Sequence, residues 1–279
     1  RYSLHEVHSY IWAYHDEYKA LGIEIEDNVK LVNSTNPNIE TLRRSMIPTQ
    51  LCQVKSNFQY AADFGIFEVG RVVDGLKDDN LCNEKKKLGI TLFSKTKTVE
   101  QLYFELRDMV AVLFDDIKHT AIILSKKEAT HSYQHLKNLN AIIADGKEIG
   151  EIGVAHPVVS KKIDKKAAIV FAELDETELA EITNKSISYE EPSRFPEMTV
   201  DLSFVAEKFE PIATAIAKAN SPLVKKVSVA DIYQDENGKS ITVRILFSHA
   251  ERTLTREEVT EVTDAVIAEL AKDGISLKN

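Results

Sequence analysis

The last third of the sequence carries an order of strand and helix patterns that few folds accommodate. Residues 199–205 alternate in polarity as a strand does, and every second residue of 241–247 is apolar. Thr255 and Glu258 form a capping box that opens a helix. The expected strands cover 199–205, 224–233, 241–247 and 275–278, and the expected helices cover 211–219 and 255–273. This β-α-β-β-α-β order predicts a ferredoxin-like domain with one open sheet face, and such faces commonly carry single-stranded RNA.

The sequence up to residue 184 predicts a separate α+β domain. Strand patterns mostly follow one another there, which favours a mixed or antiparallel sheet covered by helices. Asp145 and Gly146 give the strongest hairpin signal in the chain. The expected strands cover 2–13 (extended), 29–32, 65–73, 88–93, 120–124, 139–144, 148–154 and 168–174, and the expected helices cover 16–21, 47–60, 99–114 and a short segment from Pro157.

A polar stretch with two prolines, residues 184–196, is the best candidate for a domain boundary. We therefore expect a first domain at 1–184, a linker at 185–193 and the ferredoxin-like domain at 194–279. The chain begins at Arg1, without a methionine and close to strand-like sequence, which predicts that it is a fragment of a longer protein.

The charge of the chain limits how it can bind nucleic acid. The formal net charge is −9, and residues 194–279 carry eleven basic against fourteen acidic side chains. Because phosphate contacts require local positive charge, RNA binding must depend on a patch of the surface. The two cysteines show no CxxC spacing, and the sequence has neither a signal peptide nor an apolar run long enough to cross a bilayer. These features predict a cytoplasmic protein without membrane association.

Basic and aromatic residues of the last domain are candidates for RNA contact. Arg244 alternates with the core-facing residues of its strand, so it should project from the opposite sheet face. Tyr233, Lys225, Lys226 and Arg252 are expected near that face or at its rim. Stacking of one base on an exposed aromatic ring contributes about 1–3 kcal/mol. Tyr233 fits a structural role at the edge of the core equally well.

Two groups of charged residues in the first domain have more than one interpretation. Arg43 and Arg44 stand directly before the helix at 47–60. They fit either phosphate binding or ion pairs with acidic residues of a neighbouring subunit, and the second interpretation is favoured. Glu68 and Arg71 lie on one apolar strand and fit a structural pair better than a catalytic one.

No pattern in the sequence predicts a catalytic or metal centre. His131 and His135 are four residues apart, but the glutamate of a zinc-protease helix is missing between them. His156 fits a helix cap better than a catalytic base. The lysine runs at 85–87 and 161–162 fit solvated surfaces. The sequence also lacks a P-loop, a dinucleotide-binding glycine fingerprint and a nucleophile elbow.

Short motifs occur in a fixed order across both domains. They are Asn36-Pro37, Leu42-Arg43-x-Ser45-Met46-Ile47-Pro48, Phe67-Glu68-Val69-Gly70-Arg71, Gly150-x-x-Gly153-x-x-His156-Pro157, Arg194-Phe195-Pro196, Asp201-Leu202-Ser203, Asp231-x-Tyr233 and Thr253-Leu254-Thr255-x-x-Glu258-Val259. As an ordered set they resemble the C-terminal part of the beta subunit of bacterial phenylalanyl-tRNA synthetases. The first four look like that subunit's class II synthetase-like core, and the last four look like its ferredoxin-fold anticodon-binding domain.

The resemblance implies a subunit rather than a self-sufficient catalyst. In the family, the alpha subunit binds phenylalanine and ATP-magnesium, forms the adenylate and charges tRNA(Phe). The beta core is an inactive copy that packs against the alpha subunit in an α2β2 assembly. The strand at 67–70 lacks the arginine-x-glutamate signature that holds the ATP phosphates in active class II relatives. We therefore expect this chain to bind no cofactor itself, with ATP and magnesium held elsewhere in the enzyme.

The same reading assigns roles to particular residues. We expect tRNA contacts from Arg244, Tyr233, Lys225, Lys226, Arg252 and Lys278. We expect subunit contacts from Arg43, Arg44, Glu68 and Arg71. The helices at 47–60 and 99–114 are expected to offer apolar surface to partner subunits. The alternative is a free-standing regulatory or ligand-binding relative of synthetases, and an active synthetase would require ATP–pyrophosphate exchange by this chain alone.

Overall fold

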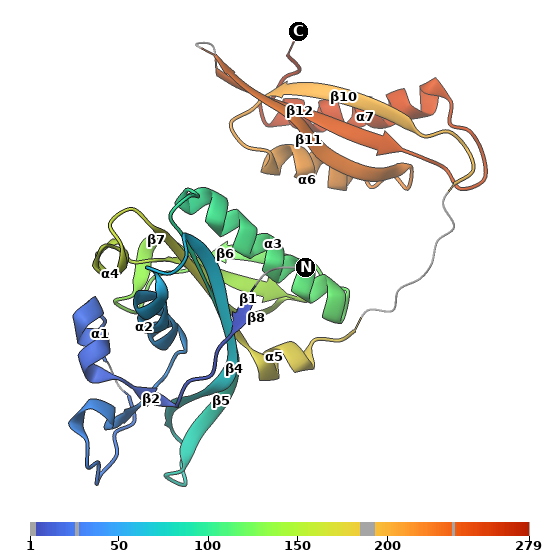
Figure 1. Ribbon diagram of the computed structural model, residues 1–279. Coiled ribbons are helices and arrows are strands. Elements are labelled where there is room, and N and C mark those ends of the chain that lie inside the picture. Colours follow the sequence, from blue (N-terminus) through green and yellow to red (C-terminus); the bar gives the residue numbers. More distant parts are fainter. Residues whose placement is uncertain (1–3, 26–27, 185–192, 236–237, 279) are drawn as a thin grey trace. The chain divides into compact units, whose positions relative to one another are not determined.

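The chain divides into two compact units, which Figure 1 shows as ribbons. The computed structural model describes residues 4–25, 28–184, 193–235 and 238–278. The units are Arg1–Ile187 and Ser188–Asn279, so their boundary falls inside the segment predicted as a linker. Residues 185–192 of that segment lie outside the described residues, and its character as a linker stays a prediction.

A mixed sheet, seven-stranded among the described residues, organises the first unit (Figure 1). Its strands in spatial order are β1 (Leu4–Glu6), β4 (Asp63–Leu76), β5 (Cys82–Ser94), β9 (Ala168–Asp175), β8 (Lys147–Ala155), β7 (Gln134–Ala144) and β6 (Ile122–Lys126). β1 runs parallel to β4, and the other neighbours are antiparallel. Asp145 and Gly146 turn the chain between β7 and β8 with positive φ, as predicted. The predicted α+β class is confirmed.

Helices cover both faces of this sheet. α1 (His15–Leu21), α2 (Ile47–Asn57) and α4 (Pro157–Ile163) share one core with the sheet, and α3 (Val99–Lys118) shares a second core with its other face. β9 serves both cores, because Phe171 points into the first and Val170 into the second. The remaining elements of the unit are β2 (Trp12–Ala13), β3 (Thr41–Leu42), the 3₁₀ helix η1 (Pro37–Ile39) and α5 (Glu176–Glu181).

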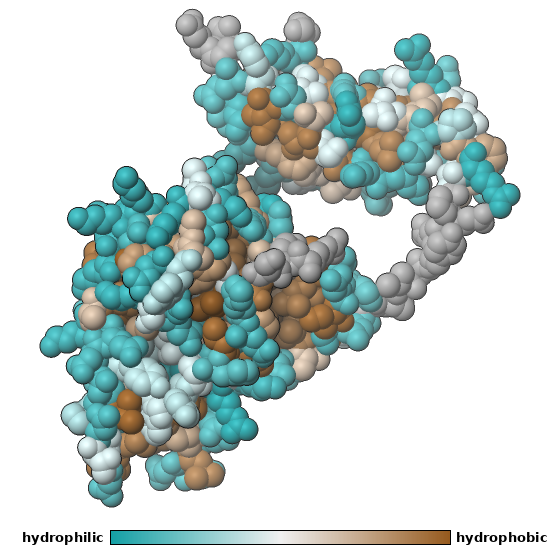
Figure 2. Space-filling view, viewed as in Figure 1, coloured by the Kyte–Doolittle hydropathy of each residue, from teal (hydrophilic) through white to brown (hydrophobic). Residues whose placement is uncertain are grey.

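One expectation for the first unit is wrong, and a second, the apolar surface of the helices for partner subunits, stays a prediction. Residues 29–32 form no strand; Lys30 makes an isolated bridge with Thr41, and Val32 is fully exposed. The apolar side chains of α2 and the apolar stripe of α3 do not face outward either, because both are buried against the unit's own sheet. α3 leaves Val99, Phe104 and Ile117 exposed, and hydrophobic residues gather in several places between hydrophilic ones on the face of the first unit seen in Figure 2.

The second unit has the predicted ferredoxin-like order. Its elements are β10 (Met198–Val205), α6 (Glu210–Ala219), β11 (Val224–Asp235), β12 (Gly238–Phe247) and α7 (Arg256–Lys272). The strands lie in the order β10-β12-β11, all antiparallel. The expected last strand is reduced to a bridge between Leu277 and Phe204 on the free edge of β10. Thr255 and Glu258 form both hydrogen bonds of the predicted capping box at α7.

The helices of the second unit cover one face of its sheet. Ile241, Val243 and Ile245 of β12 are buried in one core with apolar side chains of α6 and α7. The residues between them therefore point to the other, uncovered face. In both units, no helix among the described residues has the length and apolar character needed to cross a membrane.

Candidate functional site

The uncovered sheet face of the second unit carries an arginine at its centre. Arg244 of β12 lies opposite Asp201 of β10 on one side and Ser228 of β11 on the other. Its side chain is 55% exposed, whereas its neighbours Val243 and Ile245 are fully buried. The prediction that Arg244 projects away from the core is therefore confirmed.

Arg244 is held by a carboxylate on the neighbouring strand. Its Nε donates to Oδ1 of Asp201 at 2.8 Å, and its Nη2 donates to Oδ2 at 2.7 Å. These hydrogen bonds lower the pKa of Asp201 and raise that of Arg244, so both groups stay charged at neutral pH. The pair carries no net charge, which makes Arg244 a weaker attractor of phosphate than an unpaired arginine.

An aromatic and basic corner occupies one end of the same face. Tyr233 lies opposite Ser240 and is 54% exposed, so it does not close the edge of the core. The Nζ of Lys278 lies 4.4 Å from the centroid of the Tyr233 ring and donates to Oγ of Ser240 at 3.1 Å. The Lys278 backbone is fixed as well, because its N–H donates to the carbonyl of Ser203 at 2.8 Å.

The six residues predicted to contact tRNA separate into two groups. Lys226 pairs with Leu246 in register and so joins Arg244, Tyr233 and Lys278 on the open face. Lys225 and Arg252 instead line a hollow of about 840 Å³ at the end of the strands, together with loop residues that precede β11 and follow β12. Whether any of the six contacts RNA stays a prediction.

Within that hollow, Arg252 is engaged by an acidic residue of α7. It donates to both carboxylate oxygens of Glu258, at 2.8 Å and 2.5 Å. Arg252, together with the backbone of Thr255, lowers the pKa of Glu258 from 4.5 to about 2. Arg252 therefore supports the start of α7 in addition to any contact it makes outside the chain.

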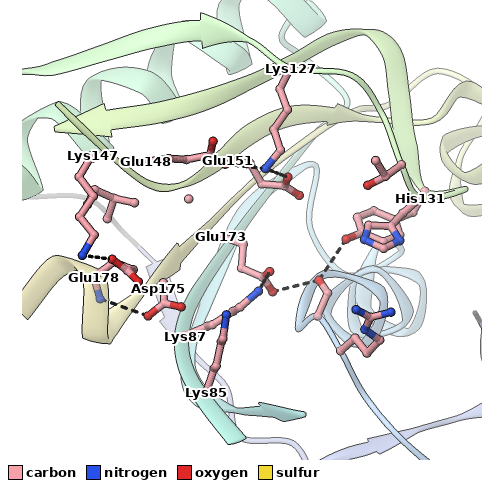
Figure 3. Close-up of a pocket in the computed structure, with 16 residues that line it drawn as sticks. Lys85, Lys87, Lys127, His131, Lys147, Glu148, Glu151, Glu173, Asp175 and Glu178 are labelled. Carbon is pink, nitrogen blue, oxygen red and sulfur yellow. Dashed lines mark hydrogen bonds and ion pairs between the residues drawn. The ribbon is translucent and has the colours of Figure 1, made fainter. Parts of the chain in front are cut away.

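The first unit contains a charged cavity of about 550 Å³ on its sheet (Figure 3). Five basic and five acidic side chains line it, so its wall is electrically balanced. The basic residues are Arg44, Lys85, Lys87, Lys127 and Lys147, and the acidic residues are Glu148, Glu151, Glu173, Asp175 and Glu178. The sequence interpretation placed Lys85 and Lys87 on a solvated face and did not single out the others, apart from Arg44.

Every basic side chain of this cavity has a carboxylate partner within the chain. Lys127 Nζ lies 2.8 Å from Glu148 and 3.1 Å from Glu151. Lys147 pairs with Glu178, a contact visible in Figure 3. Arg44 and Lys85 share the carboxylate of Asp74, at 2.8 Å and 3.4 Å. Each cation that lines the cavity is therefore already engaged by a carboxylate, and Arg44 and Lys85 have one carboxylate between them.

Glu173 connects the cavity to the start of α2. Its side chain is buried and accepts hydrogen bonds from the Ser45 hydroxyl at 2.9 Å and the Met46 N–H at 2.7 Å. Its other oxygen lies 2.7 Å from Lys87 Nζ. Burial by itself would lower the pKa of Lys87, but Glu173 raises it overall. Tyr133 donates to Ser45 at 3.2 Å, and its own pKa is raised by burial. Glu173 was detectable in the sequence as the one acid inside the apolar run at 168–174.

Both arginines before α2 have acidic partners inside this chain. Arg43 is 2% exposed, and its Nη2 lies 3.2 Å from Glu68. Ser9 completes the buried group by donating its hydroxyl to Glu68 at 2.6 Å and accepting from Arg43. The expectation that Arg43 and Glu68 contact another subunit is contradicted, because both side chains are buried within this chain. The expected interface role stays a prediction for Arg44 and for Arg71, whose partner is the exposed Glu84.

The three histidines that the sequence analysis singled out occupy structural positions. His131 stacks on Tyr133 with ring centroids 5.4 Å apart, and the ring of His135 accepts from the N–H of Lys137. His156 caps α4 by accepting from the Val158 N–H at 3.2 Å, as its position predicted. Within the described ranges, no three His, Cys, Asp or Glu side chains come together as a metal site would require.

Comparison with known proteins covers both units. The family model described as phenylalanyl tRNA synthetase beta chain CLM domain matches residues 1–176, which is more than half of the chain. The chain belongs to this family. A second model, described as ferredoxin-fold anticodon binding domain, matches residues 193–278 of this phenylalanyl-tRNA synthetase beta chain relative.

Curated relatives agree with the family assignment. A phenylalanine–tRNA ligase beta subunit from Leptospira biflexa is 25% identical over 290 residues, which cover 98% of this chain and 36% of the relative. Similar proteins with the same description from Listeria monocytogenes and Geobacillus kaustophilus are each 27% identical, over 90% and 92% of this chain. The chain spans about a third of the length of these synthetase subunits.

Proposed function

We propose that this chain supports the charging of tRNA(Phe) as part of a phenylalanine–tRNA ligase beta subunit. In this proposal the second unit binds the anticodon region of the tRNA on its open sheet face. The first unit docks the catalytic alpha subunit within an α2β2 enzyme and forms no adenylate itself. The enzyme would act in the cytoplasm, with ATP and magnesium bound by the alpha subunit.

The observation that carries the RNA-binding part is the composition of the open face. Arg244, Tyr233, Lys226 and Lys278 converge there in a unit that has net negative charge as a whole. Single-stranded RNA is bound by sheet faces that combine stacking groups with basic side chains. Tyr233 supplies an exposed ring, and Lys278 stands beside it with an ammonium group able to meet a phosphate.

The paired charges of the cavity support a non-catalytic role for the first unit. Adenylate formation requires cations that are free to stabilise the phosphates in the transition state. The lysines and the arginine of this cavity already face carboxylates at 2.7–3.4 Å or closer. A nucleotide would have to displace these carboxylates and bring its own negative charge next to them.

Two measurements test the proposal. Fluorescence anisotropy should show binding of labelled tRNA(Phe) by the chain, weakening with salt at a slope near −0.7 for each single-stranded phosphate contact. Size-exclusion chromatography should show co-migration with a phenylalanyl-tRNA synthetase alpha subunit. Loss of either result would remove the corresponding half of the proposal.

ATP–pyrophosphate exchange separates the proposal from its competitors. The chain alone should give no exchange above background, whereas the alpha and beta subunits together should be active. Exchange by the isolated chain would indicate an active synthetase. A stable chain that binds neither the alpha subunit nor tRNA would favour the free-standing regulatory relative.

A further inference from the structure

We propose that the Arg244–Asp201 pair is a flat stacking platform for one RNA base, and that Asp201 is the residue that positions it. This inference rests on the RNA binding proposed above and assigns the centre of the open face a specific task. It gives Arg244 contact with a base instead of a phosphate.

The hydrogen-bond geometry fixes the plane of the guanidinium. Asp201 binds both Nε and Nη2 of Arg244, at 2.8 Å and 2.7 Å, and two such parallel bonds keep the carboxylate and guanidinium groups nearly coplanar. The strand register holds the two residues directly opposite each other. Among the described residues, Nη1 of Arg244 has no hydrogen-bond partner, so it is available to an acceptor on a base edge.

The surroundings of the pair leave room for a planar ligand. On one side of the pair the neighbouring positions of the open face carry short side chains, namely Ser228 on β11 and the hydroxyl pair of Ser203 and Thr242, whereas the longer Leu246 and Lys226 flank it on the other side. The Arg244 and Asp201 side chains are 55% and 40% exposed. Bases of single-stranded RNA stack on arginine planes as they do on aromatic rings.

The charge of the pair separates stacking from phosphate binding. Asp201 neutralises Arg244, so a phosphate would gain little from the site and would be repelled by the carboxylate. The two roles predict opposite effects of removing Asp201. A stacking platform loses its orientation and binds more weakly, whereas a phosphate site gains a free cation and binds more tightly.

The experiment measures binding of the full 279-residue chain to a labelled unstructured RNA of about ten nucleotides at several salt concentrations. Arg244→Lys keeps the charge and removes the plane, and it should weaken binding about tenfold. Asp201→Ala should also weaken binding, and Arg244→Ala should leave the salt slope unchanged. The double variant Asp201→Arg with Arg244→Asp rebuilds the pair on exchanged strands and should recover binding.

A matched control comes from the helical side of the unit. Lys218→Met removes a similarly exposed ion pair with Glu269, and it should leave RNA binding unchanged. Thermal unfolding of each variant confirms that it is folded. Tighter binding by Asp201→Ala, or a slope reduced by about 0.7 in Arg244→Ala, would overturn the platform in favour of a phosphate contact. Unchanged binding by Arg244→Lys would overturn it as well, while failure of the wild-type chain to bind RNA would overturn the proposed function too.

Discussion

Lys87 of β5 and Glu173 of β9 meet across neighbouring strands, with Nζ 2.7 Å from Oε2. Glu173 at the same time receives the Ser45 hydroxyl and the Met46 N–H. One buried carboxylate thus joins the sheet to the start of α2 and neutralises a lysine of the cavity. The positive charge of Lys87 is therefore engaged inside the fold by a residue that also holds α2 in place.

Glu173→Gln should therefore destabilise the first unit. It leaves the Lys87 ammonium, which is 21% exposed, without its carboxylate, and the cost should be about 2 kcal/mol. Chemical denaturation measures the difference in the free energy of unfolding. The control is Glu176→Gln, which removes the exposed ion pair with Lys86 and should change the free energy by less than about 0.5 kcal/mol. Equal effects of the two variants would contradict the anchoring role of Glu173.

The buried pair of Arg43 and Glu68 makes a second stability prediction. Arg43→Met leaves Glu68 charged in the interior, and breaking a buried pair in this way costs about 3–5 kcal/mol. The double variant Arg43→Met with Glu68→Met should be less destabilised than Arg43→Met alone, because no uncompensated charge remains. A double-mutant cycle in denaturant measures the coupling, and additive losses would show that the pair does not act as a unit.

RNA binding should depend on the ring of Tyr233 and on the charge of Lys278 in different ways. Tyr233→Leu should weaken binding of single-stranded RNA about tenfold without changing the salt slope, and Tyr233→Phe should retain binding. Lys278→Met should lower the slope by about 0.7, because one phosphate contact is lost. Anisotropy titrations at several salt concentrations distinguish the two effects. A Tyr233→Phe variant as weak as Tyr233→Leu would argue against stacking.

Acid should weaken the second unit through Glu258. Its pKa is lowered from 4.5 to about 2 in the folded chain, chiefly by Arg252. Because the folded value is the lower one, the unfolded state binds more protons between these values, and the stabilisation is lost as the pH falls from about 4.5 towards 2. Glu258→Gln keeps a capping side chain but cannot titrate, so its melting temperature should fall less steeply over this range.

The matched variant is Arg252→Gln, which leaves Glu258 in place and removes the main cause of its shifted pKa. It should flatten the pH dependence in the same way. Both variants keep part of the acid sensitivity, because Glu269 also has its pKa lowered to about 2, by Lys272 and Lys218. Curves parallel to that of the wild-type chain would exclude Arg252 as the cause.

The sequence was most informative where local patterns determine structure. The capping box at Thr255 and Glu258, the turn at Asp145 and Gly146, and the outward direction of Arg244 all follow from spacing within a few residues. These features depend on short-range hydrogen bonds and on the two-residue repeat of a strand, so one segment of sequence contains them in full.

The ion pairs, in contrast, could not be predicted from local sequence patterns. Glu173 and Ser45 are 128 residues apart, and Arg244 meets Asp201 only because β10 and β12 lie side by side. In the sequence, Lys87 belongs to a lysine run typical of a solvated surface. In the structure, the pairing of β5 with β9 places it beside Glu173. Long-range pairing of this kind depends on strand order and register, which a single sequence does not reveal.

The position of β9 has a consequence for how the first unit melts. Alternate side chains of this strand, such as Phe171 and Val170, belong to the cores on the two sides of the sheet. Neither core can come apart while the strand keeps its place in the other. The helices on the two faces of the sheet should therefore unfold in a single cooperative transition. A substitution that destabilises one core should also destabilise the other.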